Sequence, residues 1–242
     1  MSRFKAMMLI YATLTIGLGS LILFTLFLFI GPFTVIDLGM GKSRALVADA
    51  FLCLFFFAQH SIMIRKGVRA RLSNLILDDY YSAFYALSSG TVLFITMLMW
   101  QKIPGTIAEA DGVLHWTLRA LFFLSFAGFY WGSRSLRSFD ALGIKKIRRL
   151  IENRETKIMP LTVRGPYRWV RHPLYLFSLI MIWSSPALTL DRLLFNTLWT
   201  GWIVFATLLE ERDLVTDFGD RYREYQARVP MIIPYRIPVR IS

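Results

Sequence analysis

Long apolar stretches with almost no charged side chains constrain this chain more than any other feature. A helix needs about 20 apolar residues to cross a bilayer. Six stretches approach that length, at residues 7–30, 45–64, 80–100, 113–132, 174–190 and 193–209. The chain is also 55% hydrophobic, which suits a membrane protein better than soluble domains. We therefore predict an all-α fold, a polytopic membrane helical bundle of five to six spans.

The last two stretches are short, and only Asp191 and Arg192 separate them. This spacing predicts a tight antiparallel hairpin, which either crosses the bilayer or re-enters the side that it left. A proline in residues 184–186 should kink the first arm of the hairpin. We expect one membrane domain, with four spans in residues 1–132 and a loop, the hairpin and a tail in residues 133–242.

Basic residues gather on one side of the predicted bundle. If the N-terminus lies inside, the inner segments 1–6, 65–79, 133–173 and 210–242 hold 2, 4, 11 and 6 Lys and Arg residues, 23 of the 28 in the chain. This asymmetry is what the positive-inside rule describes, so we expect an integral membrane protein with both termini cytoplasmic. The net charge of +12 then needs no nucleic acid partner, and membrane lipids are the expected surroundings. The oligomeric state stays open.

The densest group of chemically capable side chains comes just before the fifth apolar stretch. Residues 164–175 combine arginines, a histidine, aromatic side chains and two prolines. Pro173 suits a first helical turn, where its missing N–H costs nothing, so a helix should start at His172 or Pro173. The positive end of that helix, beside Arg168 and Arg171, suits a carboxylate or a phosphate. These residues predict a small-molecule site at a membrane surface.

Acidic and aromatic residues follow the last apolar stretch. Glu210 and Glu211 lie on an otherwise basic face, where they need an arginine or a cationic ligand as partner. Adjacent helical residues point about 100° apart, so we expect only one of the two to face the loop. Tyr222 and Tyr225 share a helical face and can stack on a nucleoside, attract a sulfonium cation or anchor the chain at the interface.

Other candidates are few. His172 can act as an acid–base group or simply cap its helix. Gln59 and His60 lie in the second apolar stretch, where polar residues either mark a site or pathway or bond neighbouring helices. No His, Cys or Asp cluster has zinc spacing, so we expect no metal site. P-loop and Rossmann glycine patterns are absent from the sequence.

Three ordered motifs together resemble a known family. They are Gly165-x-Tyr167-x-x-Val170-Arg171-His172-Pro173-x-Tyr175, then Glu210-Glu211, then Phe218-Gly219-x-x-Tyr222-x-x-Tyr225. This order is similar to that of integral-membrane methyltransferases related to isoprenylcysteine carboxyl methyltransferase. Within that superfamily, Gln59-His60-Ser61 and residues 210–214 and 229–234 resemble the methanethiol S-methyltransferase branch.

The resemblance implies S-adenosylmethionine as cofactor at the cytoplasmic face. The implied cofactor contacts are Gly165, Tyr167, Arg171, His172, Pro173, Tyr175, Glu210, Glu211, Tyr222 and Tyr225. The implied reaction is methyl transfer to a small thiol, methanethiol giving dimethyl sulfide, in a bacterial inner membrane. It needs alignment and desolvation rather than a protein nucleophile.

A thiol acceptor must react as its thiolate, so a neighbouring base would help. The catalytic candidates are His172, Glu210, Glu211 and His60, and we expect Gln59 with His60 to line the access of the acceptor. An alternative acceptor is lipid-linked, such as an isoprenylcysteine carboxylate or an amino headgroup. A transporter and a non-catalytic protein that binds acidic lipid are the rivals from other functional classes.

Overall fold

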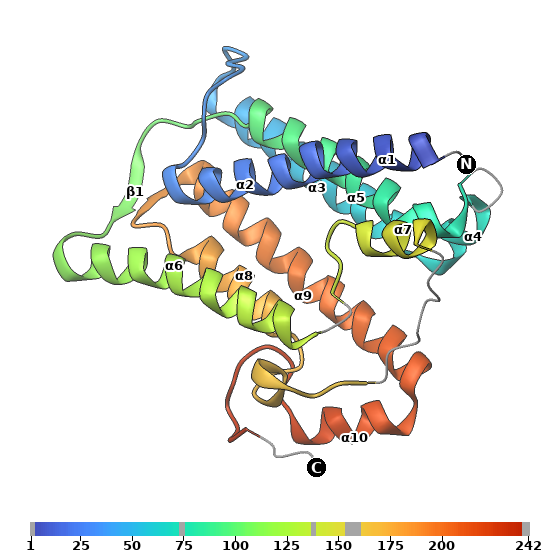
Figure 1. Cartoon of the computed structure of the whole chain (residues 1–242). Coiled ribbons are helices and arrows are strands. Elements are labelled where there is room, and N and C mark those ends of the chain that lie inside the picture. Colours follow the sequence, from blue (N-terminus) through green and yellow to red (C-terminus); the bar gives the residue numbers. More distant parts are fainter. Residues whose placement is uncertain (1–2, 73–75, 137–138, 153–160, 239–242) are drawn as a thin grey trace. The chain divides into compact units, whose positions relative to one another are not determined.

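A computed structural model describes residues 3–72, 76–136, 139–152 and 161–238. Among these residues, five helices are long and apolar enough to cross a membrane: Phe4–Ile30, Lys42–Met63, Asp78–Met99, Gly112–Ser135 and Leu190–Phe218. The strands in the same ranges are short and form one two-stranded sheet. The predicted all-α polytopic membrane bundle is therefore confirmed, with five spans by length and composition (Figure 1).

The chain divides into two compact units, which do not follow the order of the sequence. The first consists of Met1–Pro104 and Asp140–Ile158, and the second of Gly105–Phe139 and Met159–Ser242. The fourth span thus belongs with the C-terminal part of the chain. The expected organisation as one membrane domain, divided after residue 132, stays a prediction.

The first unit is built around one central spanning helix, α5, which packs against the N-terminal span, α3 and α7. The helices of this unit are α1 (Arg3–Ala12), η1 (Thr13–Leu18, a π-helix), α2 (Gly19–Ile30), α3 (Lys42–Met63), α4 (Lys66–Leu72), α5 (Asp78–Met99) and α7 (Ile144–Ile151). The π-helix continues α1 into α2, so together they form a single span. Helix α7, in contrast, is short and carries basic residues.

The second unit contains the motifs of the predicted site. Its elements are β1 (Thr106–Glu109), α6 (Gly112–Ser135), η2 (Gly165–Arg168, a 3-10 turn), α8 (Pro173–Trp183), β2 (Ala187–Thr189), α9 (Leu190–Phe218) and α10 (Asp220–Arg228). Strands β1 and β2 pair antiparallel. Helix α6 packs along α8 and also contacts η2, so the spanning helix supports the start of α8.

The predicted hairpin turn was placed wrongly. Helix α8 ends at Trp183 after 11 residues, which is about 17 Å and too short to cross a bilayer. Residues 184–189 reverse the chain, and within them β2 pairs with β1. The proline-containing segment therefore ends the helix and does not kink it. Asp191 and Arg192 lie in the first turn of α9, where the Thr189 hydroxyl accepts a hydrogen bond from the Arg192 N–H at 3.4 Å.

Candidate active site

A glycine lets the site loop run close to α6. Gly165 has a φ of +56°, in the left-handed region that glycine tolerates best. A Cβ atom at this position would also lie 2.3 Å from the hydroxyl oxygen of Ser135 on α6. The turn η2 follows, and Tyr167 within it is buried. The chain then reaches His172, the N-cap of α8, and Pro173, its first residue, which confirms the predicted helix start.

The C-terminal tail holds this loop through backbone hydrogen bonds. The N–H groups of Arg171 and His172 donate to the carbonyl oxygens of Pro230 and Met231, at 2.8 and 3.0 Å. The Arg171 guanidinium also donates to the carbonyl oxygen of Gln226 at 3.2 Å and to that of Val229. The tail segment is therefore part of the frame that positions the two residues before α8.

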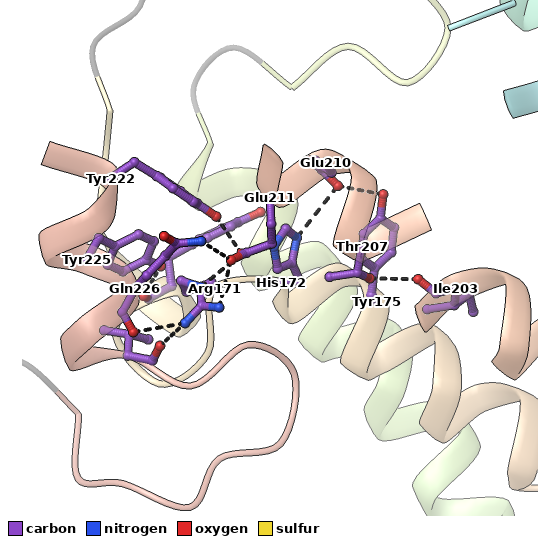
Figure 2. A network of polar contacts seen from close by, with 12 residues as sticks. Arg171, His172, Tyr175, Ile203, Thr207, Glu210, Glu211, Tyr222, Tyr225 and Gln226 are labelled. Atoms are coloured by element: carbon purple, nitrogen blue, oxygen red, sulfur yellow. Dashed lines mark hydrogen bonds and ion pairs between the residues drawn. The ribbon is translucent and has the colours of Figure 1, made fainter. Parts of the chain in front are cut away.

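Glu211 on α9 is the centre of a dense polar network (Figure 2). Its two carboxylate oxygens accept hydrogen bonds from the side chains of Arg171 (2.9 and 2.7 Å), His172 (2.6 Å), Tyr222 (2.6 Å) and Gln226 (2.5 Å). The side chain is only 9% exposed. Because a carboxylate only accepts, His172 must carry a hydrogen on Nε2. Glu211 is thus saturated by protein donors and fixes the orientation of the imidazole.

Glu210 has a different environment from its neighbour. Its side chain is 44% exposed, and its Oε2 lies 3.6 Å from Nδ1 of His172. The same oxygen accepts a hydrogen bond from the Tyr175 hydroxyl at 2.7 Å. The Tyr175 ring lies almost parallel to the imidazole, at 9°, with 5.5 Å between ring centres.

The expectation that only one of the two glutamates faces the loop was therefore wrong. The His172 ring has nitrogens on two edges, and each edge faces one carboxylate, Glu211 at Nε2 and Glu210 at Nδ1 (Figure 2). Although adjacent helical residues point about 100° apart, the imidazole is wide enough for each glutamate to approach a different ring nitrogen. The site therefore contains one imidazole between a saturated carboxylate and an exposed one.

Two tyrosines of α10 fasten the tail to the site. Tyr222 donates to Glu211, and the hydroxyl of Tyr225 donates to the carbonyl oxygen of Tyr167 at 2.5 Å. Burial raises the pKa of Tyr222, and the hydrogen bond to Glu211 and its charge raise it further. Burial likewise raises the pKa of Tyr225. Both phenols therefore keep their protons and remain donors, while stacking of their rings on a ligand stays a prediction.

The ion pair between Arg171 and Glu211 lies at the centre of the network. Burial alone would lower the pKa of Arg171, but the hydrogen bonds and the charge of Glu211 raise it above its ordinary value. The guanidinium binds the carboxylate through two nitrogens, at 2.9 and 2.7 Å. Such bidentate pairs fix geometry as well as charge. Arg171 is thus a structural cation that orients Glu211.

Several methanethiol S-methyltransferases resemble this chain over most of its length. Methanethiol S-methyltransferase 2 of Bradyrhizobium diazoefficiens is 30% identical over 213 residues, which cover 85% of this chain and 82% of that protein. The methanethiol S-methyltransferase of Pseudomonas deceptionensis is 33% identical over 210 residues, 85% of this chain and 79% of that protein. The chain belongs to the methanethiol S-methyltransferase family. It is therefore a methyltransferase.

Nurim of Rattus norvegicus is a more distant relative, 26% identical over 179 residues, 70% of this chain and 68% of that protein. No family model matches the chain. No solved structure matches it either. Membership of the methanethiol S-methyltransferase family confirms the resemblance seen in the three sequence motifs.

The access candidates Gln59 and His60 belong to the first unit, where they connect α3 to α5. The Gln59 amide donates to the hydroxyl of Ser88 at 3.0 Å, and Nε2 of His60 lies 2.6 Å from the Tyr85 hydroxyl. Bonding between neighbouring helices, one of the two interpretations of these residues, is thus present. Their role in the access of an acceptor stays a prediction.

Sequence reasoning missed Gln226, which donates to Glu211. A signal for it exists, because Gln226 follows Tyr222 by four residues and so lies on the same face of α10. Within the described ranges, no group of three or more His, Cys, Asp or Glu side chains is placed to hold a metal ion.

Proposed function

We propose that this chain transfers a methyl group from S-adenosylmethionine to a small thiol, converting methanethiol to dimethyl sulfide. The relatives that carry the name methanethiol S-methyltransferase support this acceptor. The observation that carries the proposal is the exposed Glu210 carboxylate beside His172 and Tyr175. The one-sided distribution of Lys and Arg supports a site on the cytoplasmic side of the membrane, with both termini inside. The bacterial sources of the relatives support a bacterial inner membrane.

The residues at the site fit such a cofactor. S-adenosylmethionine carries a sulfonium, an ammonium and a carboxylate, and it supplies an electrophilic methyl group. Glu210 is the half-exposed carboxylate that can accept from a cationic group, while Glu211 is fully used by protein donors. Arg164 and Arg168 are exposed at the same loop and can bind a carboxylate. The other predicted contacts form the frame: Gly165, Tyr167, Arg171, Pro173, Tyr222 and Tyr225.

A thiol must lose its proton to become a good nucleophile. Glu210 is suited to take that proton, because its carboxylate is half-exposed. Its Oε2 accepts a hydrogen bond from the neutral Tyr175 hydroxyl and lies 3.6 Å from Nδ1 of His172. In the neutral His172 ring, hydrogen on Nε2 leaves Nδ1 as an acceptor that faces Glu210. A proton taken by Glu210 can therefore be shared with Nδ1. Glu211 contributes by holding the ring in this tautomer.

The test is methyl transfer by the purified protein, with labelled S-adenosylmethionine, methanethiol and a membrane lipid extract offered together. We expect labelled dimethyl sulfide in the headspace. Glu210→Gln should lower kcat about 100-fold or more, the range of a lost acid–base group. Glu224→Gln, the same change on the exposed side of α10, should leave kcat unchanged. Label in the lipid fraction alone would instead establish the lipid-linked acceptor, and absence of any transfer would refute the proposal.

The access role of Gln59 and His60 has a separate test. If these residues line the path of the acceptor, His60→Ala should raise the KM for methanethiol while the affinity for S-adenosylmethionine stays the same. Thr91→Val is the matched control, because the Thr91 hydroxyl donates to the Leu87 carbonyl of its own helix at 2.9 Å and does not connect α5 to another described helix. Wild-type KM in His60→Ala would remove the access role and leave the proposed reaction intact.

A further inference from the structure

Helix α7 in the first unit has one apolar face and one basic face. Ile144 and Ile147 are 7% and 0% exposed, and they pack into a core that contains Ala6, Ile10, Tyr80 and Ala83. On the other face, Lys145 and Arg148 are exposed and Arg149 is partly exposed. The apolar face of α7 is therefore fully used within the protein, and the basic face is what it presents outward.

The position of this core gives the depth of α7 in the membrane. Ala6 and Ile10 lie in the first two turns of the span Phe4–Ile30, and Tyr80 and Ala83 in the first two turns of Asp78–Met99. At about 1.5 Å per residue, α7 lies within about 10 Å of the end of each span. This is the depth at which a bilayer changes from hydrocarbon to headgroups. From this depth we infer that the basic face of α7 faces the lipid headgroups.

The helix is fixed in this position by its N-terminal connection. Gly143 has a φ of +66°, and a Cβ atom there would lie 2.3 Å from the backbone of Ser82 on α5. The carboxylate of Asp140 accepts from the N–H groups of Ile144 and Lys145 at 3.2 and 2.7 Å, which caps the helix. The orientation of the basic face is therefore set by the close approach of Gly143 to α5, by the Asp140 cap and by the buried side chains of Ile144 and Ile147.

The charges on this face divide into two groups. Lys146 is neutralised by Asp78 at 2.7 Å and Asp79 at 3.5 Å. Among the residues that the structure describes, no acidic side chain forms an ion pair with Arg148 or Arg149. The next residue, Leu150, is apolar and 40% exposed. Two guanidinium groups that form no ion pair with the described residues, beside an exposed apolar side chain, match the phosphate group and the acyl chains of a phospholipid.

We propose that the outer face of α7, through Arg148 and Arg149, binds the headgroups of anionic phospholipids in the enzyme's own membrane. Charge complementarity favours an anionic partner. The depth of the helix favours a lipid over an acidic protein or a nucleic acid, which would approach from the aqueous side. This contact is separate from the Glu211 network and does not depend on the identity of the methyl acceptor.

The test compares double variants of the full chain in nanodiscs that contain mainly phosphatidylcholine and a minority of phosphatidylglycerol. The lipids that remain with the protein after mild detergent extraction are then weighed by native mass spectrometry. We expect wild type to enrich phosphatidylglycerol about fivefold or more over the bulk ratio. R148Q/R149Q should lose this enrichment, while R148K/R149K should keep most of it. The matched control is R221Q/R223Q, which removes two exposed arginines from α10 and should retain it.

Each outcome decides the proposal. Equal enrichment in wild type and R148Q/R149Q would overturn it, and so would equal losses in the α7 and α10 variants, which would indicate a general effect of charge. Abolition of the enrichment by inorganic phosphate at moderate concentration would show a simple anion site in place of a lipid site. Methyl transfer in phosphatidylcholine alone should be the same for R148Q/R149Q and wild type, which separates this proposal from the proposed function.

Discussion

Two polar clusters in this protein are built by opposite means. The cluster around Glu211 in the second unit is charged and mostly buried, and it joins Arg171, His172, Tyr222 and Gln226. The cluster in the first unit lies within two spanning helices and is made of side chains without a permanent charge: Gln59, His60, Met63, Tyr85, Ser88 and Ser89. Both connect separate helices, but only the first contains an ion pair.

The difference follows from the solvent around each cluster. A charged side chain inside the hydrocarbon region is costly, so spans α3 and α5 connect through neutral donors and acceptors. Glu211 lies in the last turns of α9, where the span ends and the chain continues into α10. There a buried carboxylate is tolerated if every lone pair is satisfied, and its partners become costly to remove. The comparison predicts a graded series of losses in stability.

The largest loss should come from Glu211→Gln. The amide keeps the size of the side chain but leaves Arg171 as a buried cation without its counter-ion. It also replaces one acceptor oxygen with an NH2 group, a donor that faces the existing donors. Breaking one partner of a buried pair costs about 3–5 kcal/mol. We expect the free energy of unfolding in mixed micelles to fall by that amount, and methyl transfer to be lost. Hydrogen exchange in the segment 220–231 should become faster.

Glu224→Gln is the control for this loss. Glu224 is 72% exposed, and among the described residues it pairs only with Arg228 on the same helix, so its removal should leave stability nearly unchanged. Slow exchange of the 220–231 segment in Glu211→Gln, as in wild type, would contradict the view that this carboxylate holds the tail to the site.

The next loss compares two tyrosines of α10, one that donates to a charged acceptor and one that donates to a neutral acceptor. Tyr222→Phe removes a hydrogen bond to the Glu211 carboxylate and should cost about 1.5–3 kcal/mol. Tyr225→Phe removes a hydrogen bond to the Tyr167 carbonyl and should cost about 0.5–1.5 kcal/mol. Both rings are buried and remain in place, so the two variants differ mainly in the acceptor. Equal losses of unfolding free energy in an SDS titration would show that the charge of Glu211 does not strengthen its hydrogen bond to Tyr222.

Much of the site could be predicted from the sequence, because its residues carry chemistry that few other positions offer. The helix start at Pro173 follows from the fixed φ of proline, and an arginine partner for the glutamates, found as Arg171 on Glu211, follows from the need of acidic residues for partners. The same reasoning failed on the geometry of the glutamate pair. It assumed that only one direction on the helix leads to the loop, whereas the His172 imidazole presents one nitrogen to each glutamate.

The parts that the sequence did not predict depend on contacts between distant segments. The end of α8 at Trp183 is decided by pairing of β2 with β1, which lies some 80 residues earlier in the chain. Gln226 gains its role only because α10 turns back onto α9. Hydrophobic length therefore predicts which segments enter the membrane, but tertiary hydrogen bonds decide where they stop.

The smallest loss should come from Tyr85→Phe in the first unit. This change removes the hydroxyl that lies 2.6 Å from His60 and keeps the ring. Hydrogen bonds between spanning helices contribute on average only about 0.6 kcal/mol, because the separated helices find other partners in the membrane. We expect a decrease of that size in the SDS titration, against no decrease for Thr91→Val, whose hydroxyl bonds within its own helix. If Tyr85→Phe cost as much as Tyr222→Phe, the neutral cluster would be as important to the fold as the charged one, and position relative to the end of a span would not explain the difference.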